Sequence, residues 1–173
     1  MSGQLNVITG PMFARKSSEL IRRMRTAVWS QKKIILFNFA GDNRYGSSEN
    51  VATHNGEYML AKKVNYLSEQ DIDDYDVIGI DELHLFPDFR VVDEWANKGK
   101  RVEVSLINSG VERSPIEAFT FVGSRATDIC FIQSICNKCY SSASFTTRTV
   151  PIRNSMIGGA ESYAPRCLKC CKL

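Results

Sequence analysis

Gly10-Pro11-Met12-Phe13-Ala14-Arg15-Lys16-Ser17 is the stretch of sequence that decides the fold. It follows an apolar run at residues 5–9 and precedes an amphipathic stretch at residues 18–29, an order that predicts a strand, a loop and a helix. The spacing of Gly10, Lys16 and Ser17 is that of the phosphate-binding loop, or P-loop, in which backbone amides and a helix N-terminus surround a phosphate chain. In such a loop Lys16 would reach the β- and γ-phosphates of ATP, and Ser17 would bind Mg²⁺.

One residue departs from this pattern, because Arg15 stands where the P-loop has Gly. The loop folds tightly around the phosphate, so this position has little room for a Cβ atom and often needs a backbone conformation that Gly adopts at little cost. We therefore expect Arg15 to weaken ATP binding unless its side chain turns outward. The alternative to a P-loop is an ordinary turn between a strand and a helix, and the rest of the chain decides between the two.

A second nucleotide-binding element is indicated by residues 76–82, where a short apolar run ends in two carboxylates, Asp81 and Glu82. In P-loop proteins an Asp at the end of such a strand lies beside the phosphate loop and holds Mg²⁺, directly or through water. Glu82 can accept a proton from an attacking hydroxyl or water. Paired acids at a strand end can also cap the following helix, but a P-loop upstream favours the functional interpretation.

Strands and helices alternate along the first three quarters of the chain. Residues 33–38, 76–80 and 101–107 are predicted strands, and their continuous apolar character fits a parallel sheet covered on both faces. Residues 89–98 and 115–121 are predicted helices. Together with the P-loop, this order predicts an α/β fold of the RecA-like P-loop kind, with a mostly parallel sheet flanked by helices.

The turn-rich stretch at residues 41–48 follows a predicted strand, at the position where open α/β sheets have their ligand crevice. Asp42 and Arg44 in this stretch are functional candidates. The alternative is a solvated pair of opposite charges on a loop.

The composition fits a soluble, intracellular protein. The chain has 173 residues, of which 43% are apolar, enough for one α/β domain with a small appendage. Residues 125–173 carry seven basic and two acidic side chains, whereas residues 1–124 carry 15 and 17. The basic C-terminal part suits the polyphosphate of a nucleotide or, less simply, a nucleic acid. The longest apolar runs have the length of a strand, so we expect a cytoplasmic protein without a membrane segment.

All six cysteines lie in the last 44 residues, and four of them form two C-x-x-C pairs. The pairs are separated by 27 residues and consist of Cys136 with Cys139 and Cys167 with Cys170. Each C-x-x-C turn presents two thiolates on one side, and tetrahedral Zn²⁺ needs four. In an intracellular chain this spacing predicts a structural zinc site, against the alternative of two incidental thiol pairs.

A zinc ion at these cysteines would tie together both ends of the loop between the pairs. That loop contains the Gly158-Gly159 step, and a clamped Gly-Gly loop is a credible lid over a ligand. We therefore divide the chain into a nucleotide-binding α/β domain at residues 1–129 and a zinc-binding domain at residues 130–173.

This combination of a P-loop, a strand-end Asp-Glu and a C-terminal loop clamped by four cysteines resembles the type II thymidine kinases, especially their cellular and poxvirus branch. The segments that carry the resemblance cover nearly the whole chain. They are Ile8-Thr-Gly-Pro-Met-Phe13, Lys16-Ser-Ser-Glu-Leu-Ile-Arg-Arg23, Asp42-Asn-Arg-Tyr45, Thr53-His54, Ile80-Asp-Glu82, Phe86-Pro-Asp88, Trp95-Ala-Asn97 with Gly99-Lys100, Phe145-Thr146 with Arg148, Ile157-Gly-Gly159 with Tyr163, and the four cysteines.

The resemblance implies transfer of the γ-phosphate of ATP to the 5′-hydroxyl of thymidine, with the zinc-clamped loop, called the lasso, closing over the thymine. It implies that Glu82 is the general base and that Arg44 and Lys16 balance phosphate charge, while Ser17 and Asp81 place Mg²⁺. The resemblance further implies an ATP site at Gly10, Pro11, Met12, Phe13, Ala14, Arg15, Lys16 and Ser17, a base site at Met12, Leu85, Thr146, Ile157, Gly158, Gly159 and Tyr163, and a homotetramer that binds no nucleic acid.

The chain departs from the family pattern at Arg15 and at two further segments, residues 107–111 and 124–128. In the first of these segments Val111 replaces an aromatic residue expected beside the base, and a lost stacking partner costs about 1–3 kcal/mol by analogy with base stacking on aromatics. Two functions stay open: an ATP-dependent thymidine kinase with an altered site, or a kinase homologue that binds nucleotide or a protein partner with impaired or no turnover.

Overall fold

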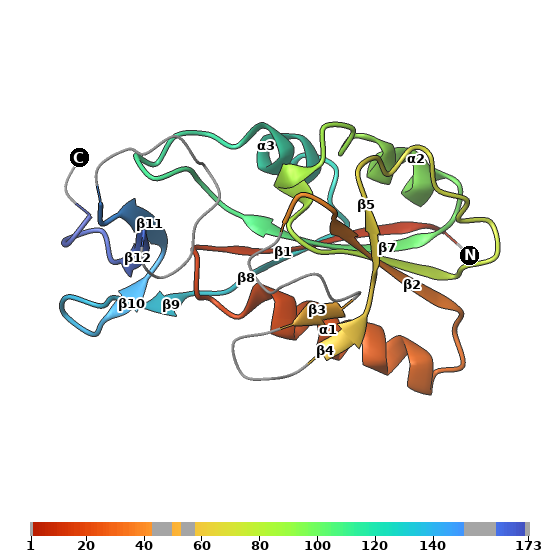
Figure 1. Cartoon of the computed structure of the whole chain (residues 1–173), viewed down its shortest axis with the longest axis horizontal. Coiled ribbons are helices and arrows are strands. Elements are labelled where there is room, and N and C mark those ends of the chain that lie inside the picture. The colour runs from red at the N-terminus through yellow and green to blue at the C-terminus, as the bar shows by residue number, and fades with distance from the viewer. Residues whose placement is uncertain (1, 43–49, 53–57, 151–161, 172–173) are drawn as a thin grey trace.

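The computed structural model describes residues 2–42, 50–52, 58–150 and 162–171, and Figure 1 shows the whole chain. Six strands form one sheet in the order β5-β2-β6-β7-β1-β8, and all five neighbouring pairs are parallel. These strands are β1 (Gln4–Gly10), β2 (Ile34–Phe39), β5 (Lys62–Val64), β6 (Val77–Ile80), β7 (Arg101–Ile107) and β8 (Asp128–Phe131).

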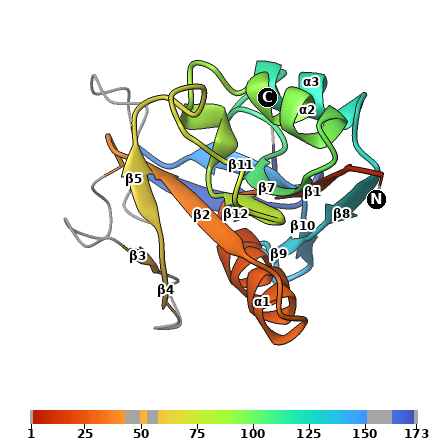
Figure 2. The ribbon, with the colours of Figure 1, turned by 90° about the vertical axis from the view of Figure 1, so that its right-hand side faces the viewer.

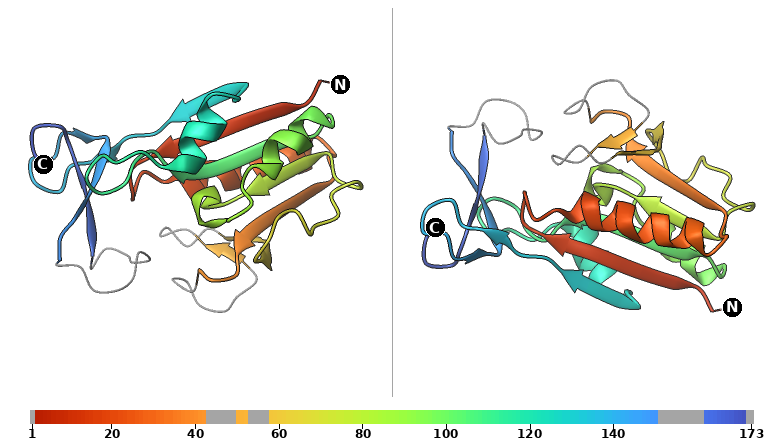
Figure 3. Two further views of the ribbon diagram at one scale, coloured as in Figure 1. Left: turned by 90° about the horizontal axis from the view of Figure 1, so that it is seen from above. Right: turned by 90° about the horizontal axis from the view of Figure 1, so that it is seen from below.

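Helices cover both faces of this sheet, as the continuous apolar strands require. Helix α1 (Lys16–Trp29) lies on one face, and α2 (Val91–Asn97) and α3 (Glu117–Gly123) lie on the other, together with the short 3₁₀ helix η1 (Leu83–Leu85) (Figures 1 and 3). Figure 2 shows the same two layers of helix from the end of the sheet. The predicted α/β fold with a mostly parallel sheet is therefore confirmed.

The sheet separates two apolar clusters. The larger one, on the side of α2 and α3, includes Phe37, Phe86 and Trp95, and the smaller one packs Leu20, Ile21 and Met24 of α1 against the opposite face. Helix α1 approaches the sheet closely at Gly79, where an added Cβ would lie 2.9 Å from the Met24 sulfur and 2.7 Å from a Leu36 methyl. A larger residue at this position of β6 would require the Leu36 and Met24 side chains to shift.

The remaining strands form three antiparallel pairs. They are β3 (Asn50–Ala52) with β4 (Tyr58–Leu60), β9 (Ser134–Ile135) with β10 (Ser142–Ala143), and β11 (Phe145–Arg148) with β12 (Tyr163–Arg166). Figure 1 places β9 to β12 beyond the end of the sheet at which β1 leads into α1. Because the sheet is parallel, this end carries the carboxyl ends of all its strands, where α/β proteins bind ligands.

The element boundaries differ from the predicted ones by a few residues. Helix α2 is shorter than predicted at both ends, and α3 begins two residues later, after Pro115 and Ile116. The apolar run at residues 129–135 divides into β8, which pairs with β1, and β9, which pairs with β10. In the described part of the chain, no helix has the length and apolar character needed to span a bilayer.

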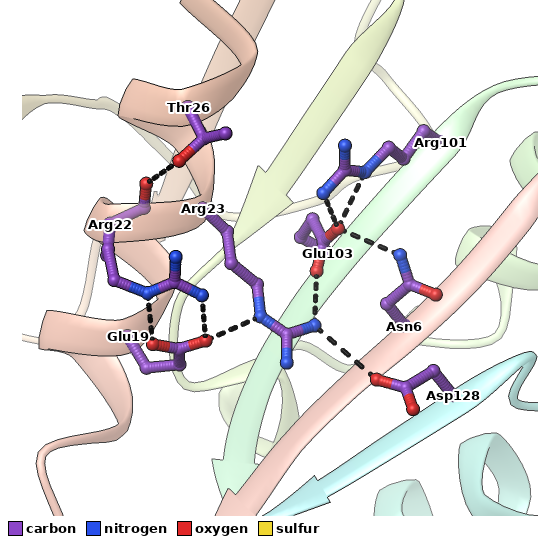
Figure 4. Close-up of polar contacts among 8 residues, drawn as sticks. All are labelled: Asn6, Glu19, Arg22, Arg23, Thr26, Arg101, Glu103 and Asp128. Carbon is purple, nitrogen blue, oxygen red and sulfur yellow. Dashed lines mark hydrogen bonds and ion pairs between the residues drawn. The ribbon is translucent and has the colours of Figure 1, made fainter.

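A buried carboxylate joins α1 to the sheet (Figure 4). The Glu103 side chain of β7 is fully buried and accepts hydrogen bonds from Asn6 Nδ2 at 2.8 Å and Arg23 Nη1 at 3.0 Å. Arg101 Nη2 lies 2.6 Å from the same carboxylate. Two guanidinium groups and one amide thus compensate the buried charge, as a stable buried carboxylate requires.

Arg23 extends this network along α1. Its Nε donates to Glu19 Oε1 at 2.8 Å, and Glu19 also accepts from Arg22 Nε at 2.7 Å. The hydrogen bond from Arg22 holds the pKa of Glu19 at about 2, helped by Arg23 and opposed by burial. Helix α1 is therefore tied to β7 one to two turns after its first residue, Lys16, so the network restrains the loop that precedes the helix.

We expect Glu103→Gln to lower the free energy of unfolding by about 3 kcal/mol, because it removes the buried charge that pairs with both Arg23 and Arg101. Asp128→Asn is the matched control, since the Asp128 side chain is 61% exposed and 3.7 Å from Arg23, and it should change stability by less than about 1 kcal/mol. Urea unfolding of both variants measures the difference. Equal losses would show that burial of the Glu103 charge is not what matters.

Candidate functional site

The loop between β1 and α1 begins at a glycine that no other residue can replace without strain. Gly10 has a φ of 153°, and an added Cβ would lie 2.0 Å from the Ile132 carbonyl oxygen. The loop is held from outside as well: Ser134 Oγ donates to the Phe13 carbonyl at 3.2 Å, and the Met12 amide donates to Thr146 Oγ1 at 2.9 Å. Segments from the C-terminal part of the chain therefore support the loop directly.

Arg15 occupies the left-handed region of backbone conformation, with φ 60° and ψ 32°. This is the conformation that the expected Gly would adopt at little cost, and in a non-Gly residue it costs about 1–2 kcal/mol. Arg15 is exposed to solvent. At Arg15 the loop thus has the backbone conformation that was predicted to favour Gly, and the Arg15 side chain is not packed inside the loop.

The loop and the strand-end carboxylate meet as the sequence predicts. Ser17 Oγ donates to the Asp81 carboxylate, at 3.0 Å from each oxygen, and Ser105 Oγ donates to the same carboxylate from β7. Lys16 is buried, and its Nζ donates to the Pro11 carbonyl at 2.9 Å. The first turn of α1, the end of β6 and the middle of β7 therefore converge on Asp81.

Burial, together with the adjacent Glu82 carboxylate, raises the pKa of Asp81 to about 6, against the opposite effect of Ser105, Ser17 and the Lys16 charge. An ionised Asp81 is thus unfavourable here unless a cation compensates it. A hydroxyl and a carboxylate are oxygen ligands of the kind that Mg²⁺ prefers. Ser17 and Asp81 therefore fit a magnesium ion by their chemistry and their proximity.

Glu82 leaves the sheet in a left-handed conformation, with φ 52°. Its amide donates to Ser105 Oγ at 3.3 Å, and its carboxylate lies 3.6 Å from His84 Nδ1. Glu82 also lines a cavity of about 690 Å³.

This cavity gathers residues that lie far apart in the sequence. The phosphate loop contributes Met12, the segment after β6 contributes Glu82 and Leu85, and the β11–β12 pair contributes Thr146 and Tyr163. All five are predicted site residues. The other predicted members of the substrate site and its surroundings lie outside the described residues; these are Arg44, Ile157, Gly158 and Gly159.

One wall of the cavity comes from residues 107–118, and it includes Val111, the residue that replaces the expected aromatic. Asn108 holds this wall at its N-terminal end. The Asn108 amide donates to the Gly10 carbonyl at 3.3 Å, and Asn108 Nδ2 donates to the Ser144 carbonyl at 3.1 Å. Because residues 107–118 lie next to the phosphate loop and to β11, substitutions in this segment can alter the cavity.

Sequence reasoning missed two residues that the structure places at the site and gave a third no role of its own. Ser105 contacts Asp81, and His84 lines the cavity beside Glu82. Arg148 also lines the cavity, but in the sequence it stood only within a family motif. The sequence did contain a signal for Ser105. Within β7, the polar residues Glu103 and Ser105 alternate with apolar residues, so both side chains lie on one face of the strand.

The four predicted cysteine ligands come together between β9 and β10 and after β12. Their sulfur atoms all lie within 4.8 Å of one another, and Cys139 and Cys167 are 3.5 Å apart. Four thiolates at about 2.3 Å from a tetrahedral zinc ion would be about 3.8 Å apart. The cluster of Cys136, Cys139, Cys167 and Cys170 can therefore hold a structural metal ion such as zinc.

We expect Asp81→Asn to stabilise the protein in EDTA at pH 8, because Asn keeps the hydrogen-bonding shape without a buried charge. The folded-state pKa of about 6 lies above the usual 3.8, so this group's contribution to stability is present below pH 4 and is lost as the pH rises through 6. The variant should gain about 3 kcal/mol at pH 8 and nothing at pH 4. Denaturant unfolding at both pH values measures this, and a gain independent of pH would contradict it.

The chain is similar over nearly its whole length to proteins of known activity. A family model described as thymidine kinase matches residues 3–171. Thymidine kinase 1 of Dictyostelium discoideum is 32% identical over 177 residues, covering 98% of this chain and 78% of that protein. The thymidine kinase of Monkeypox virus is 34% identical over 172 residues, covering 97% of this chain and 96% of that protein. On this similarity, and with the fold and the site that the structure describes, the chain belongs to the thymidine kinase family.

Proposed function

We propose that this protein is an ATP- and Mg²⁺-dependent thymidine kinase, which transfers the γ-phosphate of ATP to the 5′-hydroxyl of thymidine. Family membership supports a nucleoside kinase. The observation that carries the proposal is that Glu82 and Met12 line the same cavity. A nucleoside in this cavity would lie next to a carboxylate on one side and to the phosphate loop on the other.

On the ATP side, the loop from Gly10 to Ser17 would bind the phosphates through its amides, and Lys16 would leave the Pro11 carbonyl to reach them. Ser17 and Asp81 would hold the magnesium ion. When bound with ATP, this ion offsets phosphate charge and makes the γ-phosphorus more susceptible to attack. Arg44 would add a further positive charge, a role that rests on family resemblance.

On the nucleoside side, Glu82 would act as general base and take the proton of the 5′-hydroxyl as it attacks the γ-phosphate. Its position after β6 supports this role, since the carboxylate lines the cavity one residue from the proposed magnesium ligand Asp81. Met12, Leu85, Thr146 and Tyr163 would surround the base. Ile157, Gly158 and Gly159 would close over it, as the resemblance implies.

An alternative is a homologue that binds nucleotide, or a protein partner, with impaired or no turnover. Two departures from the family pattern favour it: Arg15 stands in the phosphate loop in place of Gly, and Val111 lines the cavity where the family has an aromatic residue. Against it, Lys16, Ser17, Asp81 and Glu82 are all present and lie around one site. We therefore favour the active enzyme.

Zinc at the four cysteines would make residues 130–173 a lasso domain, with its loop tied at both ends, next to a nucleotide-binding domain at residues 1–129. The contacts of Thr146 and Ser134 with the phosphate loop support a working connection between the two. A homotetramer in the cytoplasm completes the proposal and rests on the family resemblance.

The direct test is incubation of the purified protein with labelled thymidine, ATP and Mg²⁺, followed by separation of thymidine monophosphate. The proposal expects product that depends on Mg²⁺ and on ATP. Absence of product, with thymidine and an ATP analogue both bound, would support the inactive alternative.

We expect Glu82→Gln to lower kcat about 10²- to 10⁴-fold, because the amide cannot take the proton of the attacking hydroxyl. Binding of an ATP analogue and the unfolding midpoint should stay close to those of the parent. Glu117→Gln is the matched control, since Glu117 lines the same cavity but its side chain is 73% exposed and paired with Arg90. Thymidine phosphorylation by Glu82→Gln at the parent rate would disprove the assignment.

We expect about one zinc ion per chain in protein purified without chelator. Cys167→Ser should lose this zinc and increase protease cleavage within residues 140–166, while the sheet keeps its protection against hydrogen exchange. Cys130→Ser is the control, because Cys130 belongs to β8 and not to the cluster. Elemental analysis that finds no zinc in the parent would contradict the site.

A further inference from the structure

Arg148 and Tyr163 face each other across the β11–β12 pair, where they are direct partners in the antiparallel register. Arg148 Nη2 donates to the Tyr163 hydroxyl at 3.2 Å, and the guanidinium carbon lies 5.5 Å from the centre of the Tyr163 ring. Both residues line the cavity, and Arg148 is the one Lys or Arg among the described residues that do so. The pair therefore combines a hydrogen bond with a cation–π contact inside the proposed substrate site.

This arrangement constrains Tyr163 in two ways. The guanidinium lies over one face of the ring, so a base would contact the ring at its other face or its edge. Because a guanidinium has only donors, the Tyr163 oxygen is the acceptor in this contact and the phenol hydrogen is not used in it. Tyr163 is only 7% exposed, so its hydrogen bond with Arg148 lies in a largely dry environment.

The pair is linked to the phosphate loop through one strand. Thr146, two residues before Arg148 on β11, lies on the same face of the strand and accepts the hydrogen bond from the Met12 amide. Strand β11 thus carries both the contact of Thr146 with the phosphate loop and the contact of Arg148 with Tyr163. By holding Tyr163, Arg148 therefore sets the position of this tyrosine relative to the place where the γ-phosphate would lie.

We propose that Arg148 is a positioning residue, which holds the Tyr163 phenol so that it can contact the base of a deoxynucleoside in the cavity. Arg148 acts through Tyr163 and takes no part in phosphoryl transfer. The proposal deepens the proposed function and rests on it, since it assumes that Tyr163 contacts the substrate.

A double-mutant cycle on the full-length protein tests this role. Arg148→Met removes the charge and the donors but keeps the length of the side chain, and Tyr163→Phe removes the hydroxyl but keeps the ring. Arg113→Ala is the control. The Arg113 guanidinium makes a similar contact with a ring of β11, at 5.7 Å from the centre of the Phe145 ring. Neither Arg113 nor Phe145 lines the cavity. Steady-state kinetics with thymidine and ATP, and calorimetric binding of thymidine, are measured for all variants.

We expect each single substitution to raise KM for thymidine and its dissociation constant roughly five- to twentyfold. The double variant should be no worse than Arg148→Met alone, because the two side chains act as one unit. The values of kcat and of KM for ATP, and all constants of Arg113→Ala, should stay within about twofold of the parent. This split between the two substrates is one that a merely structural role would not produce.

Additive effects of the two substitutions would overturn the proposal, and so would equal increases in KM for thymidine and for ATP. Failure of the parent to phosphorylate thymidine contradicts the proposed function instead, and the cycle is then measured with whichever of the natural deoxynucleosides binds. If none of them binds, both the function and the role of Arg148 are wrong.

Discussion

The contact of Ser17 and Ser105 with the buried Asp81 carboxylate is the constraint on which the rest of the site depends. It joins the first turn of α1 to the end of β6 and to β7, and the ion pair of Glu103 with Arg23 fixes the same helix further along the sheet. These two polar contacts lie within an otherwise apolar interface and fix the position of α1 on the sheet. If α1 moved along the sheet, buried charges would lose the partners that compensate them. The position of the phosphate loop, which leads directly into α1, is therefore restrained as well.

The sequence could predict what is local and what has a characteristic spacing. Gly10 to Ser17, Asp81 and the four cysteines were found because their chemistry needs those residues at those intervals, and the parallel sheet followed from the alternation of apolar strands and helices. The sequence could not predict that Glu103 is compensated by Arg23, or that Arg148 faces Tyr163, because such pairs form only when distant segments pack together. Helix ends were the least well predicted, as at Ile116, whose backbone is still extended before α3 begins.

Arg15 shows how a departure from a motif can be accommodated without loss of the fold. The residue takes the left-handed conformation that the loop needs and is exposed, so the loop keeps its course at an expense of about 1–2 kcal/mol of strain. That strain is present before any nucleotide binds. If the loop does not change course on binding, the strain cancels from the binding equilibrium and appears only in the stability of the protein. The structure thus favours the outward position of Arg15, in which the residue need not weaken binding.

The measurement that tests the central claim most directly is calorimetric titration of the parent and of Arg15→Gly with a non-hydrolysable ATP analogue and Mg²⁺. If the loop is already formed for phosphate, both proteins should bind the analogue with dissociation constants that agree within about threefold. Binding by Arg15→Gly that is tenfold or more tighter would show that the arginine obstructs the phosphate, and absence of binding by both proteins would show that the loop is not a phosphate site.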